Sequence, residues 1–196
     1  MKAKITDDIK DEWSERNVMT LKRHMLELKG TGFVLRGFRK NNAEERESLV
    51  RNINSSKIAE RVSNVPFPYL PHHAIDWINK VTREDDIKRI DFVIDVDGEV
   101  AGSIAFINVE GHKAQLSYWL GEKYQGRGIM TEALKLVVEL GFSYCGFLRI
   151  WGYISEHNPA SEKVLRKAGF KLEGVHRKEW KKDGIYHDAH VFAIVR

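Results

Sequence analysis

Three glycines lie within eight residues in the middle of the chain, between a stretch with the pattern of a strand and one with the pattern of a helix. The segment is SYWLGEKYQGRGIMTEALKLVVELGF, residues 117–142, and the glycines are Gly121, Gly126 and Gly128. Glycine at the start of a helix either makes a tight turn or lets a ligand reach the free backbone amides there. Because the helix dipole adds positive character to those amides, the segment indicates a binding loop for an anion such as a phosphate.

Two common phosphate-binding motifs do not fit these glycines. A P-loop, G-x-x-x-x-G-K-[ST], needs a lysine and a hydroxyl where this chain has Arg127 and Gly128. A dinucleotide fingerprint, G-x-G-x-x-G, would begin at Gly126 and needs a third glycine where the chain has Thr131. It also needs an acidic residue about 20 positions further on, where Trp151 stands. A dinucleotide-dependent oxidoreductase is therefore disfavoured.

The composition is that of one domain with a sizeable core, since 42% of the 196 residues are hydrophobic. The 32 basic and 28 acidic residues leave a net charge of +4, an excess too small for a nucleic-acid footprint but compatible with an anionic ligand. The single cysteine excludes an internal disulfide and fits a reducing compartment. No segment has the apolar length of a signal peptide or membrane helix. We therefore expect a cytoplasmic protein that binds neither membranes nor nucleic acid.

The first 30 residues are expected to form an extension, and residues 31–196 the main domain. Over residues 7–28 apolar side chains recur at mostly helical spacing, with Gly30 after the last turn. This pattern predicts an amphipathic helix. Packing of its apolar face on the domain or on a second subunit is favoured over membrane binding, because its polar face has charges of both signs. A homodimer is one arrangement that would cover this face.

The first half of the main domain combines helical and strand patterns. Residues 32–39 (GFVLRGFR) have strand character, whereas residues 42–62 and 72–81 have helical character. After Arg89 the period changes to two, and Asp97-Gly98 suits a type I′ turn between two strands. A third strand, KAQLSYWLG, then leads into the glycine segment.

The second half of the domain predicts a crossover unit. The helix of the glycine segment lies between KAQLSYWLG and a further strand, LRIWGYIS (residues 148–155), so these two strands are expected to be parallel. NPASEKVLRKAGF (residues 158–170) then predicts a helix that Asn158 caps and that ends at Gly169. Two final strands are expected to complete the domain.

QGRGIM, residues 125–130, resembles the Q/R-x-x-G-x-G/A loop of the GCN5-related N-acetyltransferases (GNAT). Gln125 is first, Gly128 is the fixed glycine, and Met130 departs from the pattern in the last place. The longer runs YWLGEKYQGRGIMTEAL and NPASEKVLRKAGFKLEG resemble the Rim-type ribosomal-protein N-terminal acetyltransferases, and the likeness covers residues 32–196. It implies an α/β fold with a mixed, mostly antiparallel sheet flanked by helices, in which the parallel strands splay to hold acetyl-CoA between them.

The resemblance also implies a set of contacts to coenzyme A. Backbone amides near Trp119 and Leu120 would stabilise the oxyanion. Lys163 and Arg166 would contact the adenosine phosphates, with solvated surface charge as the alternative. The expected cofactor-binding residues are Tyr118, Trp119, Leu120, Gln125, Gly126, Arg127, Gly128, Ile129, Met130, Thr131, Asn158, Lys163 and Arg166.

The catalytic residues that the resemblance implies are Asn158, Ser161 and Glu179. Ser161 would donate a proton to the departing thiolate. Glu179, in HRKEWKKDG, occupies roughly the place of the active-site Glu of the Rim-type enzymes and would act as the base, although the spacing to YHD differs by about one residue. Related enzymes use instead a Glu at the position that here is Tyr153. Glu156 and an ordered water stay open as alternative bases.

The expected function is direct acetyl transfer from acetyl-CoA to a primary amine, with a protein N-terminal α-amine favoured. Polyamine or antibiotic amines stay open as acceptors, and so does a regulatory module that binds coenzyme A without chemistry. No metal is expected, because His187 and His190 are three apart in a predicted strand and point to opposite faces. Cys145 is expected to be a buried small hydrophobic residue rather than a nucleophile.

Overall fold

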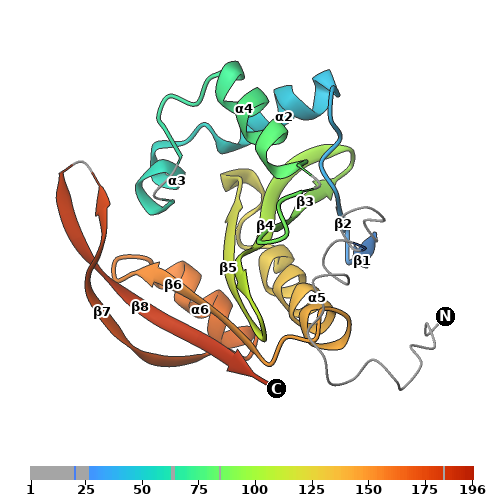
Figure 1. The fold of residues 1–196 in the computed structure, drawn as a ribbon. Coiled ribbons are helices and arrows are strands. Elements are labelled where there is room, and N and C mark those ends of the chain that lie inside the picture. Colours follow the sequence, from blue (N-terminus) through green and yellow to red (C-terminus); the bar gives the residue numbers. More distant parts are fainter. Residues whose placement is uncertain (1–19, 21–26, 63–64, 84, 183) are drawn as a thin grey trace.

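One twisted sheet with helices on both faces forms the structure, a computed structural model that describes residues 20, 27–62, 65–83, 85–182 and 184–196 (Figure 1). In chain order the elements are β1 (Leu28–Gly30), β2 (Phe33–Arg36), α2 (Ala43–Ile53), α3 (Ser56–Arg61), α4 (Pro71–Val81), β3 (Ile90–Val96), β4 (Glu99–Glu110), β5 (Lys113–Leu120), the 3-10 turn η2 (Glu122–Tyr124), α5 (Ile129–Ser143), β6 (Arg149–Ser155), α6 (Pro159–Lys167), β7 (Lys171–Lys182) and β8 (Ile185–Val195). None of the described helices combines the length and the apolar character needed to cross a membrane.

The strands lie in the order β1-β2-β3-β4-β5-β6-β8-β7. Every neighbouring pair is antiparallel except β5 and β6, which are parallel because the chain crosses over through α5 between them. The β3–β4 hairpin turns at Asp97 and Gly98, whose φ angles of 52° and 85° are the positive values of a type I′ turn. The predicted mixed sheet, crossover and hairpin are thus confirmed.

The sheet separates two hydrophobic cores, because neighbouring residues of a strand point to opposite faces. In β3, Phe92 and Ile94 belong to the core that also contains side chains of α5 and α6. Val93 belongs to the other core, together with side chains of α2, α3 and α4. Helices therefore pack against both faces of the sheet and hold its strands in place.

The helical material predicted over residues 42–62 is two helices. α2 ends at Ile53 and α3 begins at Ser56. Between them, the Ser55 hydroxyl accepts a hydrogen bond from the Ile58 N–H at 3.4 Å, so Ser55 caps α3. Short polar side chains of this kind compete with helical backbone bonding and account for the break.

Nearly all of the predicted N-terminal helix lies outside the described residues and stays a prediction. Its last residue, Leu28, is in a strand instead: β1 pairs with β2 through Leu28 opposite Leu35 and Gly30 opposite Phe33. Residues 28–30 therefore belong to the sheet, and the main domain begins slightly earlier than the predicted boundary at residue 31.

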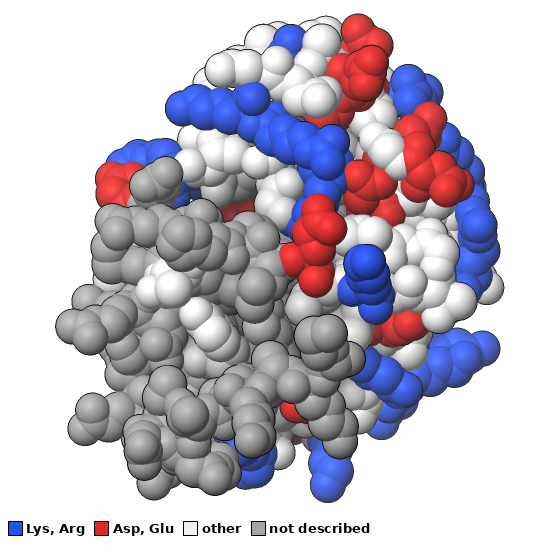
Figure 2. Space-filling view, turned by 90° about the vertical axis from the view of Figure 1, so that its right-hand side faces the viewer, with Lys and Arg blue, Asp and Glu red and all other residues white. Residues whose placement is uncertain are grey.

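The described surface mixes charges of both signs on the face that Figure 2 shows. There Lys and Arg side chains lie next to Asp and Glu side chains. Such mixing is typical of a solvated surface, and it differs from the basic stripe that nucleic-acid binding requires. The modest net charge of +4 is thus not concentrated on the described part of this face.

A buried ion network joins β2, α2 and β3. The Arg36 guanidinium donates to Glu45 Oε2 and to Asp95 Oδ2, both at 2.7 Å. The other Glu45 oxygen accepts the Arg39 N–H at 2.8 Å. Because charges in such a place are tolerated only when they are paired, the network fixes α2 against the sheet.

We expect Arg36→Ala to lower the free energy of unfolding by about 3–5 kcal/mol, because it leaves Glu45 charged and buried without its partner. Arg51→Ala is the matched control, since the Arg51 side chain is 54% exposed in its ion pair with Glu99 and such pairs contribute about 1 kcal/mol or less. Urea unfolding followed by circular dichroism measures both. Equal losses in the two variants would contradict the role given to the buried network.

Candidate active site

The parallel strands β5 and β6 separate after three residue pairs. Pairing runs from Lys113 opposite Arg149 to Gln115 opposite Trp151. Beyond that point β5 continues to Leu120 and β6 to Ser155, with no pairing between them. The two strands thus diverge toward their carboxyl ends and leave a gap in the sheet.

The backbone of β5 presents hydrogen-bonding groups to this gap. Gly121 N–H donates to Ala101 O at 2.8 Å, on the β4 side. Because N–H groups alternate in direction along a strand, those of Tyr118 and Leu120 point the other way, toward β6. The carbonyl of Leu120 points the same way and accepts Gln125 Nε2 at 2.8 Å. The strand end therefore offers donors to a ligand in the gap.

The glycine loop lies at one end of the gap, directly before α5. Gly126 and Gly128 have φ angles of 75° and 82°, a left-handed conformation that favours glycine. A Cβ built on either residue meets no atom within 4 Å. The N-terminus of α5 has no side-chain cap, so its first N–H groups are available to an anion. The geometry is that of the predicted phosphate-binding loop.

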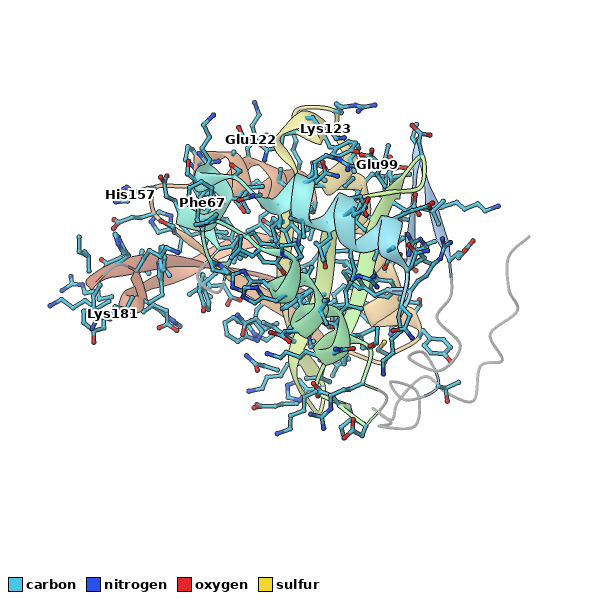
Figure 3. All side chains as sticks on the ribbon, turned by 90° about the horizontal axis from the view of Figure 1, so that it is seen from above. Phe67, Glu99, Glu122, Lys123, His157 and Lys181 are labelled. Atoms are coloured by element: carbon cyan, nitrogen blue, oxygen red, sulfur yellow. The ribbon has the colours of Figure 1, made fainter. Side chains whose placement is uncertain are left out.

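An ion cluster fixes the segment before this loop to the sheet (Figure 3). Glu99, at the start of β4, accepts hydrogen bonds from Lys123 Nζ and Tyr124 Oη, both at 2.6 Å, and from Arg51 Nη2 at 2.9 Å. The bonds from Lys123 and Tyr124 are the main reason that the pKa of Glu99 falls to about 2. Glu99 is therefore ionised at neutral pH and holds η2 in place.

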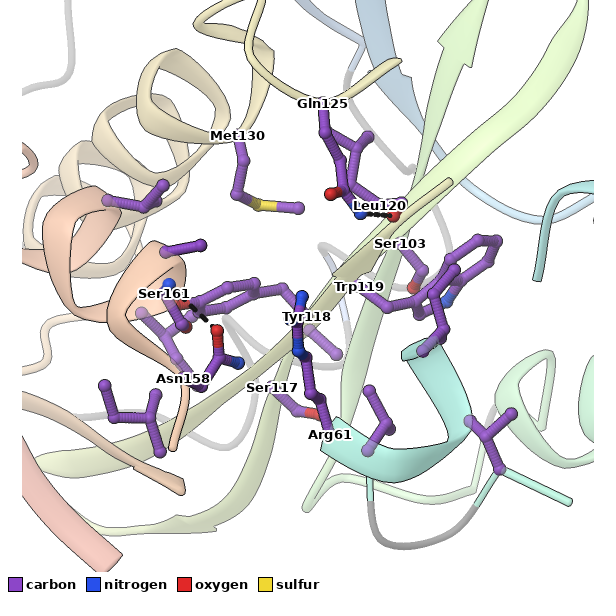
Figure 4. A pocket seen from close by; sticks show the side chains of 18 of the residues that line it. Arg61, Ser103, Ser117, Tyr118, Trp119, Leu120, Gln125, Met130, Asn158 and Ser161 are labelled. Atoms are coloured by element: carbon purple, nitrogen blue, oxygen red, sulfur yellow. Dashed lines mark hydrogen bonds between the residues drawn. The ribbon is translucent and has the colours of Figure 1, made fainter. Parts of the chain in front are cut away.

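A cavity of about 720 Å³ occupies the gap and the space beneath α3 and α4 (Figure 4). Its size is within the range of ligand pockets, roughly 300–1,000 Å³. Predicted cofactor-binding residues form much of its wall. Those that line it are Tyr118, Trp119, Leu120, Gln125, Gly126, Gly128, Ile129, Met130, Thr131, Asn158 and Lys163.

A pair of hydroxyls in the cavity wall joins β5 to α6. Tyr118 Oη of β5 and Ser161 Oγ of α6 are 2.5 Å apart. Burial raises the pKa of Tyr118 to about 12, although the bond to Ser161 partly opposes the shift. Asn158 Oδ1 accepts the Ser161 N–H at 3.2 Å, which confirms the predicted cap and fixes Ser161 in the wall. Tyr118 is protonated at neutral pH and is able to donate to Ser161.

Two of the predicted cofactor-binding residues are not in the cavity wall. Arg127 is exposed in the glycine loop. Arg166 pairs with Glu162 at 2.9 Å, and its guanidinium lies 5.3 Å from the centre of the Phe192 ring. Their roles at the adenosine end of coenzyme A stay predictions.

The structure does not bring Glu179 into the cavity. Its carboxylate is 3.2 Å from His176 Nδ1, at a bulge of β7, whereas its neighbour Trp180 lines the cavity. Successive strand residues face opposite sides, so the one-residue difference in spacing puts Trp180 at the inward position. Glu156 is exposed after β6 and does not line the cavity either.

Basic residues that the sequence pattern did not reveal line the cavity from three helices. These are Lys57 and Arg61 of α3, Lys80 of α4 and Lys167 of α6. Each is a charged residue on an amphipathic helix, a pattern that usually marks a solvated face. Only the placement of α3 and α4 over the gap shows that these faces border a cavity.

The side chains that were expected to take no part in catalysis have clear positions. Cys145 is fully buried, and burial raises the pKa of its thiol to about 12, as expected of a small hydrophobic residue.

His187 forms a group with Glu156 and His157 whose ligand atoms all lie within 4.8 Å of one another, and His190 is not part of this group. The sequence pattern did not reveal this group, because its members come from segments about 30 residues apart. That the protein uses no metal stays a prediction.

A sheet opened between two parallel strands, with a loop suited to a phosphate at one end and a pair of hydroxyls in its wall, is an arrangement suited to an acyltransferase whose donor is a long thioester that carries phosphates. Residues 33–171 match the family described as Acetyltransferase (GNAT) domain. The chain therefore belongs to the GNAT acetyltransferases, as the glycine loop predicts, and acetyl-CoA is its acyl donor.

Two relatives illustrate the range of the family. The chain is 25% identical to an uncharacterized N-acetyltransferase, p20, of Bacillus licheniformis over 162 residues, which cover 81% of this chain and 91% of p20. It is 29% identical to spermidine N(1)-acetyltransferase of Escherichia coli (strain K12) over 100 residues, which cover 50% of this chain and 54% of the enzyme. The match thus spans about half the length of the second relative.

Two solved structures share the fold. RimL, a ribosomal L7/L12 alpha-N-protein acetyltransferase in complex with coenzyme A, has a TM-score of 0.78 and 21% identity, over 87% of this chain and 98% of RimL. The microcin C7 self-immunity acetyltransferase MccE, in complex with acetyl-CoA and AMP, has a TM-score of 0.76 and 24% identity, over 85% of this chain and 94% of MccE. Both confirm the predicted GNAT fold.

We expect Gly128→Val to weaken acetyl-CoA binding at least tenfold, because its side chain would occupy the space before the α5 amides. Gly98→Val is the matched control. Gly98 has a similar φ of 85° and the same open surroundings but lies in the β3–β4 turn, so both variants introduce similar backbone strain. Titration calorimetry with acetyl-CoA measures the difference. Unchanged affinity in a folded Gly128→Val protein, or equal weakening in both variants, would contradict the role of the loop.

Proposed function

We propose that the protein transfers the acetyl group of acetyl-CoA directly to the N-terminal α-amine of a protein or peptide. The observation that carries the proposal is the Tyr118–Ser161 hydroxyl pair at the point where β5 and β6 diverge. There the thioester would lie between a backbone donor and a proton donor, with the acceptor entering from the side of α3 and α4. The fold of RimL, an alpha-N-protein acetyltransferase, adds support for this class of acceptor.

The proposed reaction needs no covalent enzyme intermediate. The neutral amine attacks the thioester carbonyl carbon, and the oxygen becomes an oxyanion that the Leu120 N–H, which faces the gap, stabilises. When the C–S bond breaks, Ser161 donates a proton to the thiolate and recovers one from Tyr118, whose hydroxyl it contacts. Tyr118 is then reprotonated from solvent. The attacking nitrogen gives up its proton, and the products are the amide and coenzyme A.

The proton of the amine goes to solvent in this proposal. Neither Glu179 nor Glu156 lines the cavity, so neither carboxylate considered as the base borders the space proposed for the acceptor. An α-amine with a pKa of about 7.7–8.0 is partly neutral at physiological pH, whereas a lysine-like amine near 10.4 is almost wholly charged. An enzyme without a dedicated base is therefore suited to an α-amine.

The alternative acceptor is a polyamine, because spermidine is the substrate named for one relative. A polyamine site requires carboxylates to bind the additional ammonium groups. Among the described residues that line the cavity, Glu122 is the one acid, and it already accepts the Ser55 hydroxyl at 2.5 Å and Lys57 at 3.0 Å. The α-amine acceptor is therefore favoured.

We expect acetylation of peptide N-termini to exceed acetylation of spermidine and of lysine side chains in a mass-spectrometric screen with acetyl-CoA. Peptides with a blocked α-amine but a free lysine are the control for the site of transfer. Transfer to spermidine alone, or coenzyme A binding without turnover on any amine, would overturn the proposal.

We expect Ser161→Ala to lower kcat/KM by about tenfold or less and with little dependence on pH, since a thiol with a pKa near 8.5 is a fair leaving group without help. Tyr118→Phe should have a comparable effect, and the double variant should lose little more than either single variant, because both act in one proton path. Steady-state kinetics with a peptide acceptor measure all three. Multiplicative losses in the double variant would show that the two hydroxyls act independently.

We expect Glu179→Gln to preserve the wild-type dependence of kcat/KM on pH. In both proteins kcat/KM should rise through the pKa of the acceptor amine, about 7.7–8.0, and then level off, because the neutral amine is the reactive form. A loss in Glu179→Gln that is largest at low pH and recovers as pH rises would instead identify Glu179 as the base.

A further inference from the structure

Positive charge lines the cavity well beyond the region expected to bind coenzyme A. Lys163 and Lys167 belong to α6, beside the expected cofactor. The remaining cations are on the opposite side, beneath the helices that cover the acceptor end. They are Lys57, Arg61, Lys80 and Arg89. The phosphates of the donor therefore do not account for all of the basic residues.

Two of these four cations already have acidic partners. Lys57 donates to Glu122 at 3.0 Å. Arg89 pairs with Asp91 at 2.6 Å, and its guanidinium lies 4.7 Å from the centre of the Trp77 ring. These two side chains are parts of the wall rather than open binding groups.

Arg61 and Lys80 differ from them, because no ion pair joins either one to an acid among the residues that the structure describes, although Arg61 has a longer-range attraction to Glu122. Figure 4 shows that Arg61 extends from the end of α3 into the cavity, toward Tyr118. Its guanidinium has five N–H donors in a planar fork that matches a carboxylate. An arginine that lines the cavity in this way is suited to a ligand that brings a negative charge.

We propose that the acceptor end is a subsite for an acidic peptide, in which Arg61 and Lys80 bind carboxylates within the first few residues after the α-amine. This inference rests on the proposed function and narrows its substrate class. A peptide with an acidic side chain in its second or third position places a carboxylate a few ångströms from the reacting amine.

The test compares three peptides that share an N-terminal serine and differ at positions two and three, with Glu-Glu, Gln-Gln or Lys-Lys there. At low ionic strength we expect kcat/KM for the acidic peptide to exceed that for the neutral one by about fivefold or more, with the basic peptide lowest. At about 0.5 M salt the preference should shrink, because partly exposed charges are screened.

Arg61→Gln should bring the acidic and neutral peptides to within about twofold of each other while acetyl-CoA affinity is unchanged. Arg51→Gln removes the same charge outside the cavity, in the exposed pair with Glu99, and should leave the preference intact. A wild-type enzyme without preference, or a preference that survives Arg61→Gln, would overturn the subsite. If none of the three peptides is acetylated, the proposed function is wrong, and the subsite proposal fails with it. If all three peptides are acetylated equally, the proposed function stands and only the subsite proposal fails.

Discussion

The active site depends on one interruption: the pairing of β5 and β6 stops after Gln115 and Trp151. If β5 and β6 stayed paired, the N–H groups of Tyr118 and Leu120 would donate hydrogen bonds to β6. No space would then be left between β5 and α6. Because pairing stops, the strand end, the glycine loop and the capped helix all face one gap. The two cores hold the sheet from either face, so the strands on both sides of the gap are fixed by packing.

The sequence predicted those parts of the site whose structure depends on residues close together in the chain. The left-handed glycines before α5 and the Asn158 cap of α6 each require a particular residue type at a particular spacing. Periodicity determined the crossover and the hairpin in the same way. Family likeness then joined these local features into one site, and the structure places most of the predicted cofactor-binding residues in a single cavity wall.

The differences between the sequence expectations and the structure have equally physical causes. Glu179 was assigned by spacing, and in a strand an offset of one residue exchanges the inner face for the outer one, so Trp180 lines the cavity instead. Arg61 and Lys80 were missed because a charged helix face has the same pattern whether it borders solvent or a cavity. The hydroxyl pair of Tyr118 and Ser161 joins residues 43 positions apart, a contact that only the sheet topology brings about.

The gap also exposes the edges of two strands inside the molecule. Edges with unpaired N–H and C=O groups attract other strands and promote association between chains. Here α3 and α4 cover one side of the opening and α5 and α6 flank the other (Figure 1). Because these helices enclose both edges, another chain cannot pair along them without displacing a helix. The same enclosure that shapes the site therefore also protects the protein from aggregation through its own open sheet.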